Sequence, residues 1–357
     1  MNDYKLPASY QYSVGVQRAL NAKSVLSVSY VGNQNRHQND YSEYNLPSAS
    51  ALPSLINGAK YNLAPGLPYP GFHSIRLAAN EANSHYNAFQ VDLNSQVGRD
   101  LQLRAYYTLS RTIDPTTAGN GGGDLGNVSN PYLGWQYDVG PSGYDRTHNA
   151  AFNFIYDIPV LRHSQSRLVR STVGGWQVSG IVVVESGLPI NPQIGGPLGG
   201  SGLPNATNRL NASGAISTPH TVGSWFDNTQ TFAPNPNPLS PNFGVLTLVS
   251  EGPFTPPAEG QFGTLGHNSL RGPGRDNWNL SLFKSFIFSE ARGSRLEFRV
   301  ESFNTWNHTQ FNAINRSLSY HFNSDFGKYL PDKGQQFGQA TSAFDPRIFQ
   351  LGAKLYF

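Results

Sequence analysis

The chain has 357 residues and a formal net charge of +3, with only 13% charged and 38% hydrophobic residues. Its basic residues form no block of the kind that binds nucleic acid, and the absence of cysteine excludes a disulfide framework and thiolate metal sites. A soluble chain with so few apolar residues is normally rich in charge. This one is rich in Asn, Ser, Gly, Pro and aromatic residues instead, a composition typical of many strands joined by long polar loops.

Apolar and polar residues alternate with a period of two, and helical periodicity is hard to find. In chain order the alternating segments are residues 9–20, 26–30, 87–94, 101–109, 150–158, 176–184, 278–282, 295–301 and 349–357. Allowing for uncertain ends, each fits the roughly 9–11 residues of a tilted membrane strand. The longest connection has room for one further strand. We therefore predict an all-β, antiparallel transmembrane barrel wall of about nine to ten strands.

The connections between these segments alternate between shorter turns and long loops, as in outer-membrane barrels with short periplasmic turns and long extracellular loops. In a soluble β-sandwich, no physical constraint makes every second loop long. On this pattern the ninth strand ends in the periplasm and the first starts outside. A complete barrel has an even strand count, and no signal peptide is visible at Met1. We therefore expect strands upstream of Met1.

The polar positions of the strands carry long charged side chains, which a water-filled lumen accepts. The clearest case is Arg295, Glu297, Arg299 and Glu301, which we predict to form a lumen-facing charge ladder. Such a ladder would contact a plug inside the barrel or would simply be solvated. The apolar positions are then expected to face lipid. The competing interpretation is a soluble antiparallel sheet with one solvent-exposed face.

The last eight residues, QLGAKLYF, match the terminal signal of outer-membrane proteins. The signal residues are Gln350, Gly352, Leu355 and Phe357. A last strand presents an open edge of unpaired backbone groups, with which the barrel-assembly machinery can pair. A strand that merely ends in Phe is the alternative.

Eight motifs spread over most of the chain have a familiar order and spacing. They are YSVGVQR (12–18), VSYVG (28–32), HYNAFQ (85–90), YTLSRTID (107–114), DRTH (145–148), GWQVSG (175–180), RGPG (271–274) and FNTWNH (303–308). On these motifs the chain resembles the C-terminal barrel of the Oar-like TonB-dependent receptors. The resemblance implies a barrel of about twenty-two strands, a plug inside it and a periplasmic energy-coupling partner. We expect residues 1–357 to be a C-terminal segment of such a barrel domain, with the plug and N-terminal domains absent.

No catalytic constellation and no cofactor site stand out, and we expect no enzymatic activity. We interpret DRTH as a motif at the start of a strand with a local ion pair, and GGG (121–123) as loop rather than phosphate site. The ring faces of Tyr132, Trp135 and Tyr137 suit stacking on a sugar-like ligand, against the alternative of packing within the loop.

Three functions remain open from the sequence. The first is a barrel segment of an active transporter for a bulky nutrient, in the outer membrane of a Gram-negative type bacterium. The second is a structural, adhesive or secretion-related outer-membrane barrel, because long loops suit that role equally well. The third is a soluble β-rich binding module. The partners expected for the first are outer-membrane lipid, the assembly machinery and, through the missing plug, the coupling protein.

Overall fold

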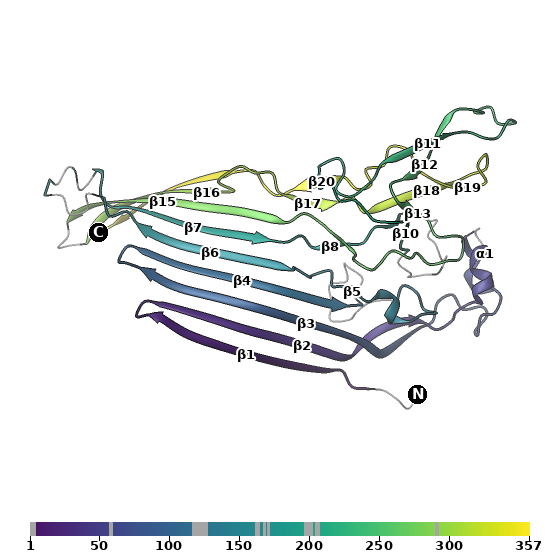
Figure 1. Cartoon of the computed structure of the whole chain (residues 1–357), viewed down its shortest axis with the longest axis horizontal. Helices are drawn as coiled ribbons and strands as arrows, with labels where there is room; N and C mark the ends of the chain where they lie inside the picture. The colour runs from purple at the N-terminus through teal and green to yellow at the C-terminus, as the bar shows by residue number, and fades with distance from the viewer. Residues whose placement is uncertain are drawn as a thin grey trace.

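In the described part of the chain, nine long strands form one antiparallel sheet in which each pairs with the next long strand along the chain (Figure 1). The computed structural model describes residues 5–56, 60–115, 128–160, 165–166, 169, 172–195, 203, 208–289 and 293–357. The long strands are β1 (Ala8–Asn21), β2 (Ser24–Glu43), β3 (Arg76–Val97), β4 (Leu101–Asp114), β6 (His148–Asp157), β7 (Trp176–Glu185), β15 (Arg275–Ser289), β16 (Ser294–Phe303) and β21 (Ile348–Tyr356). All nine predicted strands are confirmed. The short β5 (Gly140–Pro141) extends the sheet beside β4.

The predicted alternation of shorter and long connections is also confirmed. The connections after β1, β3 and β15 have two, three and four residues, and the connection after β6 spans residues 158–175. The other four connections are long, spanning residues 44–75, 115–147, 186–274 and 304–347. Gly98 and Gly293 have φ angles of +65° and +68° at two of the short turns, where a side chain would be strained. In Figure 1 the C-terminus lies at the short-turn end of the sheet.

The strand register separates an apolar face from a polar one, because residues directly opposite each other in antiparallel strands share a face. One row across six strands consists of Leu101, Tyr156, Val178, Leu282, Val300 and Leu351. The adjacent row, displaced by one residue on each strand, consists of Gln102, Ile155, Ser179, Ser281, Glu301 and Gln350. The alternation in the sequence therefore becomes two chemically different surfaces.

The apolar face has no second layer of protein over it among the described residues. Leu351 is 77% exposed, and neither buried apolar cluster includes a residue of the nine long strands. Val182 is only 5% exposed, but its register places it between two large aromatic side chains, Phe152 and Trp278. Its burial therefore comes from neighbours in the same sheet.

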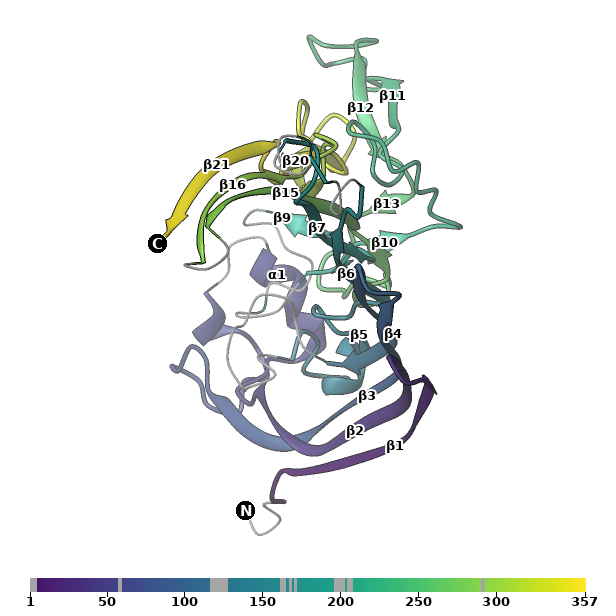
Figure 2. The same ribbon diagram turned by 90° about the vertical axis from the view of Figure 1, so that its left-hand side faces the viewer.

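The sheet curves into an open arc, and its first and last strands, β1 and β21, do not pair with each other (Figure 2). The residues that line a hollow on the sheet are mainly those of the polar row and its neighbours, so the polar face is the concave one. The architecture is thus an antiparallel outer-membrane-type barrel wall that is not closed.

The long loops contain more regular structure than the sequence indicated. Their elements are the 3-10 turns η1 (Ala49–Ala51), η2 (Tyr61–Leu63) and η3 (Trp135–Asp138), the helix α1 (Leu52–Ile56), and the strands β8 (Pro189–Ile190), β9 (Gln193–Gly195), β10 (Asn211–Ala212), β11 (Gln230–Pro234), β12 (Leu246–Glu251), β13 (Phe254–Thr255), β14 (Leu270–Arg271), β17 (Phe311–Ile314), β18 (Ser317–Asn323), β19 (Lys328–Pro331) and β20 (Ala340–Ala343). The longest loop, in which we allowed for one further strand, has seven short strands in its described part, and none of them joins the sheet of long strands.

The two longest loops pack against each other as a loop layer, by which we mean the described residues of 186–274 and 304–347. Its core includes Phe226, Phe254 and Phe337, whose ring centroids lie 5.1–5.5 Å apart in edge-to-face contacts. The strands β9 and β18, one from each loop, pair in parallel. The third and fourth loops are therefore a folded unit and not only polar linkers.

No helix in the described part of the chain is long and apolar enough to cross a membrane.

A charge placed on the apolar face should destabilise the protein far more than the same charge on the polar face. Leu282 and Ser281 are adjacent on β15 and lie on opposite faces. We expect Leu282→Arg to cost about 2–4 kcal/mol in lipid vesicles, and Ser281→Arg about 0.5 kcal/mol or less. Urea unfolding of both variants measures the difference, and equal losses would contradict the assignment of faces.

Candidate functional site

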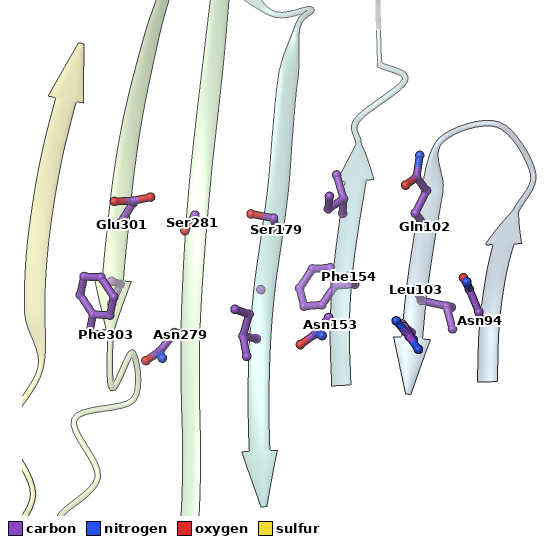
Figure 3. Close-up of a pocket in the computed structure, with 15 residues that line it drawn as sticks. Asn94, Gln102, Leu103, Asn153, Phe154, Ser179, Asn279, Ser281, Glu301 and Phe303 are labelled. Atoms are coloured by element: carbon purple, nitrogen blue, oxygen red, sulfur yellow. The ribbon is translucent and has the colours of Figure 1, made fainter. Parts of the chain in front are cut away.

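A hollow of about 580 Å³ lies on the concave polar face (Figure 3). Six strands contribute to it: β3, β4, β6, β7, β15 and β16. The polar side chains among its lining residues are Asn94, Gln102, Arg104, Asn153, Ser179, Asn279, Ser281, Glu301 and Ser302. Amides and hydroxyls predominate, so the wall offers both donors and acceptors of hydrogen bonds with little net charge.

The one cation among the lining residues, Arg104, is held by its neighbours on the same face. Its guanidinium lies 2.9 Å from a carboxylate oxygen of Asp92 and 4.4 Å from the ring centroid of Tyr106. Both members of the ion pair remain partly exposed, so the pair contributes little to stability. Its effect is to leave the hollow without an unbalanced charge at this position.

The four residues of the predicted charge ladder are brought together on the concave face. Arg299 forms an ion pair with Glu297 at 2.9 Å, and the Arg295 guanidinium lies 3.9 Å from the ring centroid of Tyr356. Glu301 lines the central hollow, while Glu297 and Arg299 line a second one of about 370 Å³. The ladder thus links two hollows along β16, whereas contact with a plug stays a prediction.

The second hollow lies where β6 ends and β7 begins, at the short-turn end of the wall. Asp157, Gln177 and Ser285 are among its lining residues, and Gln177 donates to Asp157 Oδ1 at 2.8 Å. Polar surface therefore continues from the central hollow to the short-turn end of the concave face.

The C-terminal signal residues divide between the two faces. Gln350 and Gly352 lie on the concave face opposite Glu301 and Arg299, and Leu355 lies on the apolar face, where the terminal Phe357 is fully exposed. A Cβ at Gly352 would lie 3.4 Å from Arg299 Cγ, so the glycine leaves room for that side chain. β21 is the last strand in the sheet order, with one edge paired to β16. Its role in assembly stays a prediction.

The three loop aromatics are placed by contacts within the loops. The hydroxyl of Tyr132 donates to Pro47 O at 2.8 Å and that of Tyr137 to Gly263 O at 2.6 Å. Both rings meet Phe262 edge-on at 6.1 Å, and Trp135 is half-buried in η3. These contacts support a packing role, and binding of a sugar-like ligand by these residues stays a prediction.

A buried arginine and aspartate complete this loop junction. Arg209 stacks over Tyr137 at 3.6 Å and donates to the backbone oxygens of Leu265 and Tyr137. Asp138 accepts the backbone N–H of Ser129 at 2.7 Å, and burial raises the pKa of the Asp138 carboxyl.

Three of the sequence motifs meet at one ion pair whose carboxylate is buried. Asp145, directly before β6, is fully buried and accepts the backbone N–H of Thr112 at 2.6 Å. Arg271 forms an ion pair with the Asp145 carboxylate and also donates to its backbone oxygen at 2.9 Å. The position of DRTH before a strand is confirmed, but the prediction of a local ion pair is wrong, because the partner lies 126 residues away.

Sequence reasoning placed the four ladder residues on one face of a strand but missed the central hollow, whose residues come from six strands. The period-two polar positions were its only signal. Among the described residues, no cluster of three or more His, Asp or Glu side chains could hold a metal ion. The triple glycine at 121–123 lies outside the described residues.

A family model described as "Outer membrane beta barrel domain" matches residues 1–350. The chain belongs to this family. As an outer-membrane β-barrel domain it lies in the cell outer membrane, with its apolar convex face toward lipid. Short turns in such barrels are periplasmic and long loops extracellular, so the loop layer lies outside the cell.

Comparison with solved structures finds outer-membrane transporters and receptors. The chain is similar to the outer membrane transporter YddB from Escherichia coli, with 9% identity, 99% of this chain and 33% of that chain covered, and a TM-score of 0.45. It is also similar to the ferric-catecholate import receptor Fiu from E. coli K12, with 10% identity, 100% of this chain and 29% of that chain covered, and a TM-score of 0.41. A third similar structure is the ferripyoverdine receptor of Pseudomonas aeruginosa, with 10% identity, 97% of this chain and 27% of that chain covered, and a TM-score of 0.40. The chain thus spans about a third of the length of these proteins. Comparison with curated protein sequences gives no match.

Removing the arginine that pairs with the buried Asp145 carboxylate should destabilise the barrel domain strongly. Arg271→Met leaves the Asp145 carboxylate buried without its cation, and we expect a loss of about 3 kcal/mol. Arg104→Met breaks an ion pair whose members are both partly exposed, and we expect a much smaller loss. Denaturant unfolding in detergent compares the two. A smaller loss for Arg271→Met than for Arg104→Met would contradict the structural role of the pair.

Proposed function

We propose that the chain forms part of an energy-coupled outer-membrane transporter of the TonB-dependent receptor type that takes up a bulky nutrient. The observation that carries the proposal is the concave polar wall. Charged side chains, amides and hydroxyls line it together with apolar residues such as Ile155 and Ile181, and it continues through two hollows to the short-turn end. A wall of this kind suits the passage of a polar solute through a wide lumen.

The width of the barrel supports a bulky cargo. Eight-stranded barrels have interiors that side chains fill, and only much larger ones enclose channels or plugs. Here nine long strands still leave an open arc. The wall therefore fits a barrel of the larger class.

The Oar-like subgroup is part of the proposal. Its support is that three of the motifs on which the resemblance rests converge on the Asp145–Arg271 ion pair. In this proposal a plug contacts the ladder on β16 and receives energy from a periplasmic coupling protein. The chain then acts by binding and passage and not as an enzyme.

An adhesive or structural role is the second candidate. The observation that favours it is the loop layer, which has its own core and carries exposed apolar side chains such as Leu239 and Phe243 on the connection between β11 and β12. The soluble alternative is excluded by membership of the outer-membrane family.

Uptake can be tested in cells that carry or lack the full-length protein. We expect at least one bulky solute to be depleted from a complex medium only when the protein is present. Because the proposed uptake is energy-coupled, a protonophore should stop this depletion. Ser281→Trp fills the central hollow and should slow depletion severalfold. Its neighbour Leu282→Trp, on the lipid face, is the matched control and should not. The second candidate would be favoured if cells with and without the protein depleted the medium equally and only the cells lacking the protein lost adhesion to surfaces.

A further inference from the structure

A separate cleft of about 410 Å³ opens in the loop layer. It is formed by the end of β12, by β13 with the segment after it, and by the hairpin of β18 and β19. Figure 1 shows these elements gathered at the end of the molecule opposite the C-terminus. The cleft shares no lining residue with the two hollows of the barrel wall.

The floor of the cleft is aromatic and buried. Phe254 and Tyr320 are buried beneath it, and the Tyr320 hydroxyl donates to Phe254 O at 3.5 Å. Phe254 also contacts Phe226 and Phe337 edge-to-face. The floor of the cleft is therefore part of the core of the loop layer.

One side of the cleft presents the exposed ring of Phe322 beside the partly buried ring of Tyr329. Phe322 and Tyr329 are opposite each other in the β18–β19 hairpin, with ring centroids 5.4 Å apart. Phe322 is 54% exposed, and Pro256 and Pro257 are also among the lining residues. An exposed aromatic side chain at the rim of a concave apolar surface is typical of binding sites.

The polar groups at the rim carry both signs of charge. The side chain of Glu259 is hydrogen-bonded to that of Tyr329, and Lys328 precedes Tyr329 in the lining. Ser250 and Thr255 add hydroxyls. A charged ligand would meet one group of like charge, whereas a hydroxyl can donate to the carboxylate and accept from the ammonium.

We propose that this cleft binds a carbohydrate. The apolar C–H face of a sugar ring would lie on the exposed ring of Phe322, which Tyr329 meets edge-on. The hydroxyls of the sugar would bond to Glu259 and Lys328. The volume falls within the range of about 300–1,000 Å³ of small-molecule sites. This extracellular capture site goes beyond the proposed transport function, and it does not depend on passage through the barrel.

Direct binding tests the proposal on the full-length protein in detergent, with neutral malto-, cello- and chito-oligosaccharides as probes in titration calorimetry. We expect one series to bind, and Phe322→Ala to weaken its binding about tenfold or more. Glu259→Gln should also weaken it. Phe243→Ala is the matched control, since Phe243 is 59% exposed in the same loop layer but outside the cleft, and it should bind like the unaltered protein.

Three outcomes would overturn the proposal: no binding of any probe, binding that Phe322→Ala leaves unchanged, or binding only of a proline-rich peptide that Phe322→Ala abolishes. Because the assay measures binding without transport, its failure is distinguishable from a failure of the uptake experiment.

Discussion

Hydrocarbon offers no hydrogen-bond partner to a peptide group, so a strand that crosses the membrane must pair its backbone with neighbouring strands. That constraint fixes the antiparallel register of the nine long strands, and the register fixes the faces. Leu282, Val300 and Leu351 share one surface, and Ser281, Glu301 and Gln350 share the other. The hollows, the charge ladder and the lipid surface all follow from this separation.

The wall could be predicted from sequence because each strand carries its own alternation, which does not require knowledge of its neighbours. The loop layer could not. Its strands are mostly two to seven residues long, too short for a period to show, and its core joins Phe226, Phe254 and Phe337 from distant segments. The sequence pattern also missed the polar end of β2 and the polar start of β3. Asn39 pairs with Asn80 there, and without alternating apolar residues the sequence has no strand signal.

The candidate sites divide in the same way. The ladder on β16 could be predicted because it lies within one strand, whereas the central hollow needs the register of six. The partner of Asp145 could not be predicted, because a buried carboxylate can recruit any cation that the fold brings near it. Arg271 reaches it only because β14 pairs with β8 just beyond the end of β7.

The two faces of β16 offer the most direct test of the central claim. The chain has no cysteine, so single cysteines at positions 295–301 can each carry a spin label in outer-membrane vesicles. Labels at 296, 298 and 300 should be reached by oxygen dissolved in lipid, and those at 295, 297, 299 and 301 by a water-soluble nickel complex. Accessibility without a period of two, or with the two faces exchanged, would contradict the account.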